Sequence, residues 1–124
     1  MTPQSPSELR LSKDRRTLTV TFGTAPSSFT AEFLRVYSPS AEVKGHGAGP
    51  RRIVPGKKNV TITALTPVGH YAVQLTFSDG HNTGIYTWEY LQSLSQSQFD
   101  LWGQYTDALT AQGLSRISAT EKAS

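Results

Sequence analysis

The chain has 124 residues, no cysteine and a formal net charge of +3, from 12 basic and nine acidic residues. This length fits one domain with a single modest core. The lack of cysteine excludes a disulfide framework, a thiolate nucleophile and a cysteine metal site, and no run of 18 apolar residues is present to cross a membrane. The first residues carry neither a basic region nor an apolar stretch, so we expect no signal peptide and a cytoplasmic protein.

Residues 1–6, with two prolines among small polar side chains, are expected to be a disordered lead. Two half-buried strands should follow, because apolar and polar residues alternate in two short runs separated by a polar turn at 13–16. The apolar members are Leu9 and Leu11 in the first run and Leu18, Val20 and Phe22 in the second. The segment 31–36 fits either a helical turn or a third strand, and Pro39 limits any helix there.

A segment rich in glycine and proline, residues 45–56, is predicted to be an exposed loop. The stretch from Lys44 to Lys58 contains no acid and five bases, which are Lys44, Arg51, Arg52, Lys57 and Lys58. Without these five, the remaining seven bases face nine acids, a net charge of −2. The sequence therefore assigns the positive charge to this loop and not to the whole domain.

Two further runs alternate, and they predict an antiparallel pair of strands with one buried face. The apolar members are Val60, Ile62 and Ala64 in the first run and Val73, Leu75 and Phe77 in the second. Pro67 and Gly69 lie between the runs and indicate the connecting turn.

After Tyr86 the apolar spacing changes to three and four residues, which is typical of helices. A short helix is predicted from Trp88, Leu91 and Leu94, and a second helix with one buried face from Phe99, Trp102, Tyr105 and Leu109. Ser97 is the expected N-cap of the second helix and Gly113 its stop.

Strands first and helices last predict an α+β fold. We expect a two-layer sandwich, in which a mainly antiparallel β-sheet is covered on one face by the C-terminal helices. The single domain should span residues 7–113, followed by a disordered polar tail at 114–124.

Two stretches carry a resemblance to a known family: Glu32 to His46 (EFLRVYSPSAEVKGH) and Asp79 to Trp88 (DGHNTGIYTW). Together they resemble the small domain that precedes the catalytic domain of gamma-butyrobetaine hydroxylase, a 2-oxoglutarate-dependent oxygenase. The resemblance spans roughly residues 8–94 and includes the run Val68-Gly69-x-Tyr71-Ala72. Stand-alone bacterial proteins of this length, of unknown function, are a closer match than the hydroxylases. The same domain also occurs attached to ATPases that carry iron–sulfur clusters.

The resemblance implies a zinc site in the hydroxylases that this chain does not retain. In that family the first stretch reads roughly Leu-Arg-Asp-Asn-Cys-Pro-Cys-x-x-Cys, and its three cysteines bind zinc together with one histidine of the second stretch. Here Ser38, Ser40 and Val43 stand at the cysteine positions, while His81 remains. A hydroxyl is a poor zinc ligand and valine is none.

Catalysis is not expected. Iron and 2-oxoglutarate oxygenases need a His-x-Asp/Glu pair and a distant histidine, but His46, His70 and His81 have no acid two positions later. A serine nucleophile at Ser38 would need a histidine base and an orienting acid, and the sequence has no nucleophile elbow.

The motif residues have alternative interpretations. His81 with Asp79, Glu42 and His46 offers an oxygen–nitrogen set for a weakly held zinc or iron ion. The simpler prediction is that no metal or other cofactor binds, that His81 caps a backbone group in a turn, and that the hydroxyls of Ser38 and Ser40 bond nearby backbone. Arg35 either forms a structural ion pair, with Glu32, Glu42 or Asp79, or grips a carboxylate or phosphate ligand.

The resemblance, with an aromatic-rich C-terminal third, predicts a non-catalytic protein-interaction module. The aromatic residues are Tyr86, Trp88, Tyr90, Trp102 and Tyr105. The resemblance links the partner protein to iron or iron–sulfur protein maturation, or to an oxygenase. One alternative is a metal-binding domain centred on His81. Another is a weak polyanion binder through the Lys44–Lys58 loop, although nucleic acid is not the expected partner because that loop has no aromatic residue for base stacking.

Overall fold

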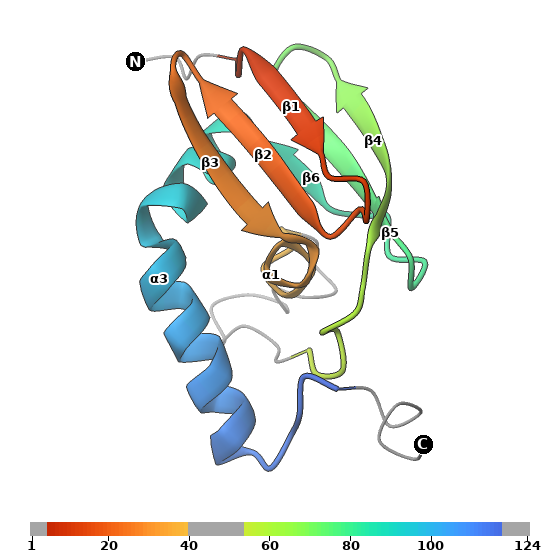
Figure 1. Cartoon of the computed structure of the whole chain (residues 1–124), viewed down its shortest axis with the longest axis vertical. Coiled ribbons are helices and arrows are strands. Elements are labelled where there is room, and N and C mark those ends of the chain that lie inside the picture. The colour runs from red at the N-terminus through yellow and green to blue at the C-terminus, as the bar shows by residue number, and fades with distance from the viewer. Residues whose placement is uncertain (1–4, 40–53, 118–124) are drawn as a thin grey trace.

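The computed structural model describes residues 5–39 and 54–117 (Figure 1). Within this part of the chain six strands form two antiparallel three-stranded sheets. The first sheet has the order β1 (Glu8–Leu11), β2 (Thr17–Phe22), β3 (Ala25–Thr30). The second has the order β4 (Ile62–Val68), β5 (Ala72–Phe77), β6 (Ile85–Thr87). A short helix α1 (Ala31–Val36) follows β3, and a long helix α3 (Trp88–Ala111) follows β6.

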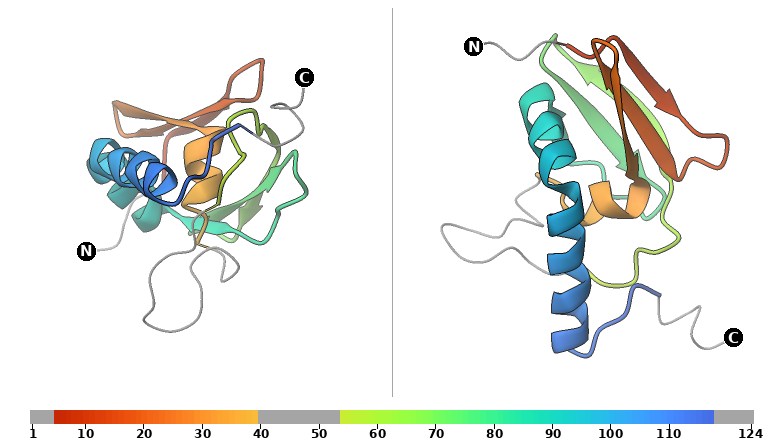
Figure 2. Two further views of the ribbon diagram at one scale, coloured as in Figure 1. Left: turned by 90° about the horizontal axis from the view of Figure 1, so that it is seen from below. Right: turned by 60° about the vertical axis from the view of Figure 1, so that its left-hand side comes forward.

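The two sheets face each other across the core. Figure 2 shows α1 between the sheets at one end and α3 running along one side of them, where it contacts β3 and β6. The C-terminal half of α3 extends beyond the ends of the strands (Figures 1 and 2). The architecture is therefore α+β, as the sequence predicted, but with two sheets and with one long helix beside them.

Both predicted strand pairs are present. In the first, Leu9 pairs with Val20 and Leu11 with Leu18, and the side chains of Leu18 and Val20 are fully buried. In the second, β4 pairs with β5. The core combines side chains from both sheets and both helices, among them Phe29, Phe33, Leu34, Ile62, Leu75, Phe77, Tyr86 and Leu91.

A β-bulge in β4 corrects one predicted core position. The pairing of β4 with β5 shifts register between Ile62 and Ala64. A bulge inserts one residue and so reverses the alternation beyond it. Ile62 is therefore fully buried as predicted, whereas Ala64 is exposed.

The sequence missed two strands. β3 has Phe29 as its only large apolar side chain and contains Pro26, which suits an edge position but gives no alternating signal. β6 has three residues and is too short to show a period. Of the two structures expected for residues 31–36, the helix is correct, and the Thr30 hydroxyl caps it by accepting from the Phe33 N–H at 3.1 Å.

The C-terminal region is one continuous helix, so the prediction of two helices was wrong. Its N-cap is Thr87, whose hydroxyl accepts from the Tyr90 N–H at 3.0 Å, and Ser97 lies inside the helix. Gly113 adopts a left-handed φ of 68° just after the helix, as its predicted role as a stop requires.

Phe99 is 90% exposed, although its spacing had placed it on the buried face of α3. It lies roughly 120° around the helix from the buried Tyr105, at about 100° per residue. In the described part of the chain no helix is long and apolar enough to span a membrane. Residues 1–4 of the predicted lead and residues 118–124 of the predicted tail lie outside the described residues. Residues 114–117, which the prediction assigned to the tail, are described, and Arg116 among them pairs with Glu32.

Candidate functional site

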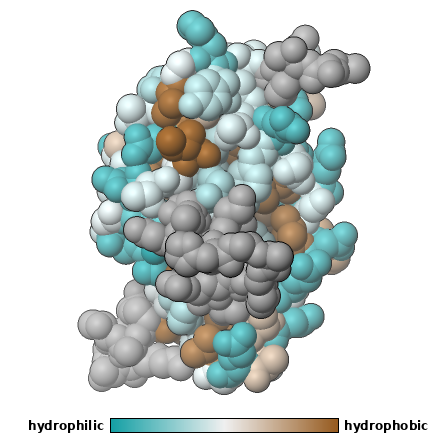
Figure 3. All heavy atoms as spheres, turned by 180° about the vertical axis from the view of Figure 1, so that it is seen from behind, coloured by the Kyte–Doolittle hydropathy of each residue, from teal (hydrophilic) through white to brown (hydrophobic). Residues whose placement is uncertain are grey.

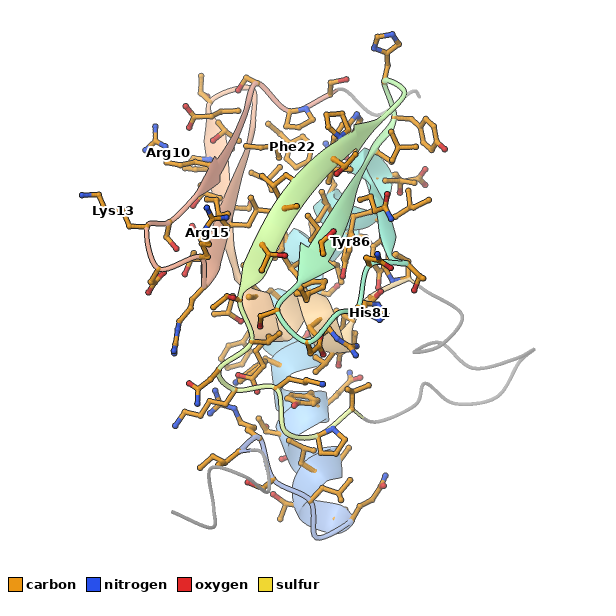
Figure 4. The ribbon with its side chains drawn as sticks, turned by 90° about the vertical axis from the view of Figure 1, so that its right-hand side faces the viewer. Arg10, Lys13, Arg15, Phe22, His81 and Tyr86 are labelled. Carbon is orange, nitrogen blue, oxygen red and sulfur yellow. The ribbon has the colours of Figure 1, made fainter. Side chains whose placement is uncertain are left out.

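A hydrogen bond between Ser38 and His81 forms the centre of the motif region. Ser38 follows α1, and His81 follows the turn that ends β5. The Ser38 Oγ lies 3.0 Å from the His81 Nε2, and both residues are buried. Figure 4 shows His81 beside α1, at the end of the second sheet. Two of the four positions that the resemblance assigned to zinc ligands are thus neighbours, and a direct hydrogen bond joins them. The sequence predicted a bond from the Ser38 hydroxyl to nearby backbone, and the bond that the described residues show is to the His81 side chain.

Gly84 leaves the space that Ser38 occupies. A Cβ atom on Gly84 would lie 2.3 Å from the Ser38 Oγ and 3.2 Å from the Tyr86 ring. Tyr86 is fully buried, and its hydroxyl donates to the Leu34 carbonyl oxygen. The Tyr90 hydroxyl donates to the Tyr37 carbonyl oxygen at 2.5 Å. These hydroxyls satisfy carbonyl groups at the C-terminal end of α1, which have no partner within the helix.

Gly84→Ala is expected to lower the free energy of unfolding by about 1–3 kcal/mol, since a methyl group inserted there must displace Ser38 or Tyr86. Chemical denaturation measures this loss, and the His81 ring signals in NMR spectra should shift as the Ser38 bond is disturbed. Gly103→Ala is the control, because a Cβ there meets nothing within 4 Å. Equal stability of the two variants would contradict the close packing at Ser38.

Asp79 lies beside this hydrogen bond and forms ion pairs with two cations. Its Oδ2 lies 2.8 Å from the Arg35 Nε and 2.6 Å from the Lys57 Nζ, and its Oδ1 accepts from the His81 N–H at 3.1 Å. Burial acts to raise the pKa of Asp79, but the hydrogen bonds from Lys57 and His81 and the charge of Arg35 outweigh it and lower the pKa to about 2. A lowered carboxyl pKa stabilises the fold above the unfolded value of 3.8, and this stabilisation is lost as the pH falls towards 2.

Arg35 therefore has a structural partner, which is Asp79 and not Glu32. Its side chain is only 12% exposed, and its Nη1 is buried without a hydrogen-bond partner among the described residues. Glu32 instead binds Arg116, through two hydrogen bonds of 2.7 and 2.9 Å. Glu42, the third acid named for Arg35, lies outside the described residues.

The described motif residues do not fit a zinc ion. No cluster of three or more His, Asp or Glu side chains suitable for a metal occurs within residues 5–39 and 54–117. Ser38 offers a neutral hydroxyl that is bonded to His81, and the Asp79 carboxylate is already neutralised by two cations. His46 and Ser40 lie outside the described residues, as do Glu42 and Val43.

We expect the purified protein to contain no stoichiometric zinc and to unfold at the same temperature with and without EDTA, since a neutral hydroxyl replaces a thiolate at Ser38. Elemental analysis and thermal unfolding measure the two quantities. One tightly held metal ion per chain that is lost on His81→Ala, but kept on His70→Ala, would contradict the prediction.

The structure adds a second basic region that the sequence argument missed. Four exposed bases lie on the β1–β2 hairpin, namely Arg10, Lys13, Arg15 and Arg16. Figure 4 shows Arg10 and Lys13 projecting outwards from the first sheet. The Arg15 Nη1 donates to the Thr63 carbonyl oxygen of β4 at 3.2 Å. The Arg16 Nη1 donates to the Asn59 Oδ1 at 3.0 Å, so the hairpin lies next to the segment that carries Lys57 and Lys58. The sequence signal for this region was the presence of four bases among the seven residues 10–16.

Outside the loop of Lys44 to Lys58 the chain still has a net charge of −2, and four of its seven remaining bases lie together on this hairpin. Of the five bases named in that loop, Lys44, Arg51 and Arg52 lie outside the described residues, and Lys57 is paired with Asp79.

Most aromatic side chains of the C-terminal third belong to the core. Tyr86, Trp88 and Tyr105 are buried, while Tyr90 and Trp102 are partly buried. On the face opposite to that of Figure 1, the visible apolar surface forms separate patches (Figure 3). The large apolar side chains exposed in the described part are Tyr71, Ile85, Phe99, Leu114 and Ile117.

Comparison with known proteins identifies related sequences and structures. A family model described as gamma-butyrobetaine hydroxylase-like, N-terminal, matches residues 9–92. No curated protein matches the chain. Two solution NMR structures are similar to it. The first is 44% identical to this chain with a TM-score of 0.79, and the match covers 91% of this chain and 90% of the other. The second is 47% identical with a TM-score of 0.76, and the match covers 94% of this chain and 90% of the other.

A crystal structure at 1.93 Å resolution is also similar. It is of a protein of unknown function of the DUF971 family from Acidithiobacillus ferrooxidans. That protein is 44% identical with a TM-score of 0.62, and the match covers 77% of this chain and 98% of the other.

Proposed function

The chain belongs to the gamma-butyrobetaine hydroxylase-like, N-terminal family, and from this premise we propose that it is a non-catalytic protein-interaction module. The family model is of the N-terminal part of the hydroxylase-like proteins and not of their catalytic part, which supports a non-catalytic role. We place its action in the cytoplasm.

The observation that carries the proposal is that the described motif side chains bond to one another. Ser38 bonds His81, and Arg35 bonds Asp79. Ser38 is fully buried, so a substrate would have to displace the packing around it before its hydroxyl became accessible. A pocket of about 260 Å³ near the C-terminal end of α3 is lined by none of these residues. This arrangement supports a role in holding the fold and not in chemistry.

The narrower part of the proposal concerns the partner. We place it among proteins of iron or iron–sulfur maturation, or among oxygenases. This part rests on the resemblance to a domain that precedes an oxygenase catalytic domain and also occurs attached to ATPases that carry iron–sulfur clusters. Affinity capture from a native lysate of the source cells, with and without RNase, tests the interaction. The expected result is a protein partner that is retained after RNase treatment. Capture of RNA alone, or of nothing, would contradict the proposal.

A second candidate function, weak binding of polyanions, is favoured by one specific observation. The Arg16–Asn59 hydrogen bond places the basic hairpin beside the segment of Lys57 and Lys58. The two regions together form a wider basic surface than the loop alone. Asp79 neutralises part of it by pairing with Lys57.

We expect this surface to bind nucleic acid weakly and without sequence preference, with an affinity that falls steeply as salt rises, because phosphate contacts release counterions. Titration of a labelled single-stranded oligonucleotide at several salt concentrations measures the slope. Serine at Lys13, Arg15, Arg16 and Lys58 should reduce the slope, while serine at Gln92 and Gln96 of α3 should not. Submicromolar binding at physiological salt that is lost with the four basic side chains would promote this function over protein interaction.

A further inference from the structure

The long helix α3 carries three carboxylates and no base along its 24 residues, in a chain whose net charge is positive. These carboxylates belong to Glu89, Asp100 and Asp107, and all three are exposed. Every other carboxylate in the described part of the chain has an ion pair or a hydrogen bond, as shown by Glu8, Asp14, Glu32 and Asp79. The three on α3 have neither, so their charge is unbalanced within the described residues.

The three carboxylates form one ridge. At about 100° per residue, Glu89, Asp100 and Asp107 lie within about 20° of a single line along the helix. They are spaced by about 16 Å and 10 Å, from a rise of about 1.5 Å per residue. Phe99 lies about 80–100° around the helix from this ridge, and Gly103 lies one turn after Phe99. Phe99 is 90% exposed, and a Cβ on Gly103 would meet nothing within 4 Å.

Building on the proposed interaction function, we infer that this acidic face of α3 is the docking surface, and that its partner is a protein presenting a basic segment with an apolar side chain for Phe99. The acidic ridge attracts lysine or arginine side chains. Phe99 supplies the apolar contact, and the bare backbone at Gly103 lets the partner approach closely beside it. A second copy placed symmetrically on this face would bring the same three carboxylates together, which repel.

The first test uses the full chain and a defined probe. The probe is a short amphipathic helical peptide of leucine and lysine, and the control is the same peptide with glutamate in place of lysine. NMR titration of the isotope-labelled protein should give shift changes along the exposed face of α3 with the lysine peptide only, and these should weaken with salt. Phe99→Ser should weaken binding by about tenfold or more, as expected for an aromatic anchor.

Matched variants make the test specific. Asp100→Asn with Asp107→Asn should also weaken binding, whereas Tyr71→Ser, which removes a 57% exposed aromatic ring elsewhere, should not. Because these side chains are exposed, the variants should unfold at the same temperature as the parent protein. Shifts that avoid α3, equal binding of the glutamate peptide, or unchanged binding by Phe99→Ser would overturn the inference.

Lysate capture then separates this inference from the function on which it rests. The Phe99→Ser, Asp100→Asn, Asp107→Asn triple variant should lose the partner that the parent protein retains. A partner captured equally by both would leave the interaction function standing and overturn the α3 surface. If neither captures a protein, the interaction function fails, and the peptide titration still decides whether α3 binds basic apolar segments.

Discussion

Trp88→Ala is expected to lower the free energy of unfolding by about 3–5 kcal/mol, the usual cost of removing a large buried aromatic side chain. Trp88 is the first residue of α3 and is only 8% exposed. It belongs to the core that also contains Val73 and Leu75 of β5. Its indole N–H donates to the His70 carbonyl oxygen at 2.8 Å. Alanine would leave a cavity and remove this bond, a large share of the roughly 5–15 kcal/mol by which a domain is stable.

Urea denaturation of the parent protein and the variant measures the difference. Phe99→Ala is a matched control on the same helix: because Phe99 is 90% exposed, its loss should change stability by no more than about 0.5 kcal/mol. A loss below about 1 kcal/mol for Trp88→Ala, with intact folding, would show that the ring does not anchor α3 to the sheets and would make Trp88 a candidate for the interface.

Arg116→Ala is expected to cost about 3 kcal/mol, because it leaves the Glu32 carboxylate buried without a cation. Glu32 lies in α1 and is 4% exposed. Arg116 donates to both of its oxygens, and its guanidinium lies 5.0 Å from the centre of the Trp102 ring. The Arg116 side chain is 39% exposed, so the cost should fall at the lower end of the range for buried pairs. Burial, and then the charge of Glu32, raise the pKa of Tyr105, whose hydroxyl stays protonated beside the pair.

A double-mutant cycle gives this prediction its control. The double variant Arg116→Ala, Glu32→Gln should be more stable than the sum of the two single losses implies, because it leaves no buried charge. Arg10→Ala, which breaks the exposed pair with Glu8, should cost no more than about 1 kcal/mol. Additive losses in the cycle would mean that Arg116 stabilises the fold by packing on Trp102 alone.

The strands that the sequence predicted correctly have one buried face and sufficient length. Leu18 and Val20 in β2, and Leu75 and Phe77 in β5, alternate with polar residues and are buried as expected. β3 was missed because only Phe29 of its six residues is buried, so no period-two signal exists. Local alternation also cannot reveal a bulge, which is why Ala64 was assigned to the wrong face.

Helical spacing failed at Phe99 for a related reason. Periodicity reports which residues lie near one side of a helix, but only the packing partner decides how wide the covered side is. Tyr105 and Leu109 lie further along α3 than Phe99 and are buried, so the helix is covered on their side beyond Phe99. Phe99 lies roughly 120° around the helix from Tyr105, on a side that is left exposed.

The candidate site could be predicted only in part. The proximity of Ser38 and His81 followed from the family resemblance, because these residues are 43 positions apart and no local pattern joins them. The sequence had named Asp79 among the acids for Arg35. It could not predict that Lys57 also pairs with Asp79, because no local pattern joins these two residues. The acidic ridge on α3 is visible in the sequence as a helical segment with acids and no bases. Only the structure shows that every other described acid has an ion pair or a hydrogen bond, whereas these three do not.

The pairing of Glu32 with Arg116 also bears on how the chain folds. These residues are 84 positions apart, and the same C-terminal segment forms backbone hydrogen bonds from Gly56 to Ser115 and from Lys58 to Arg116. Contacts between distant parts of a chain raise the contact order and slow folding, since a long loop must close before they form. The family match ends at residue 92, so a fragment cut there would lack Tyr105, Leu109 and Arg116. The packed structure therefore extends beyond the segment by which the family is recognised.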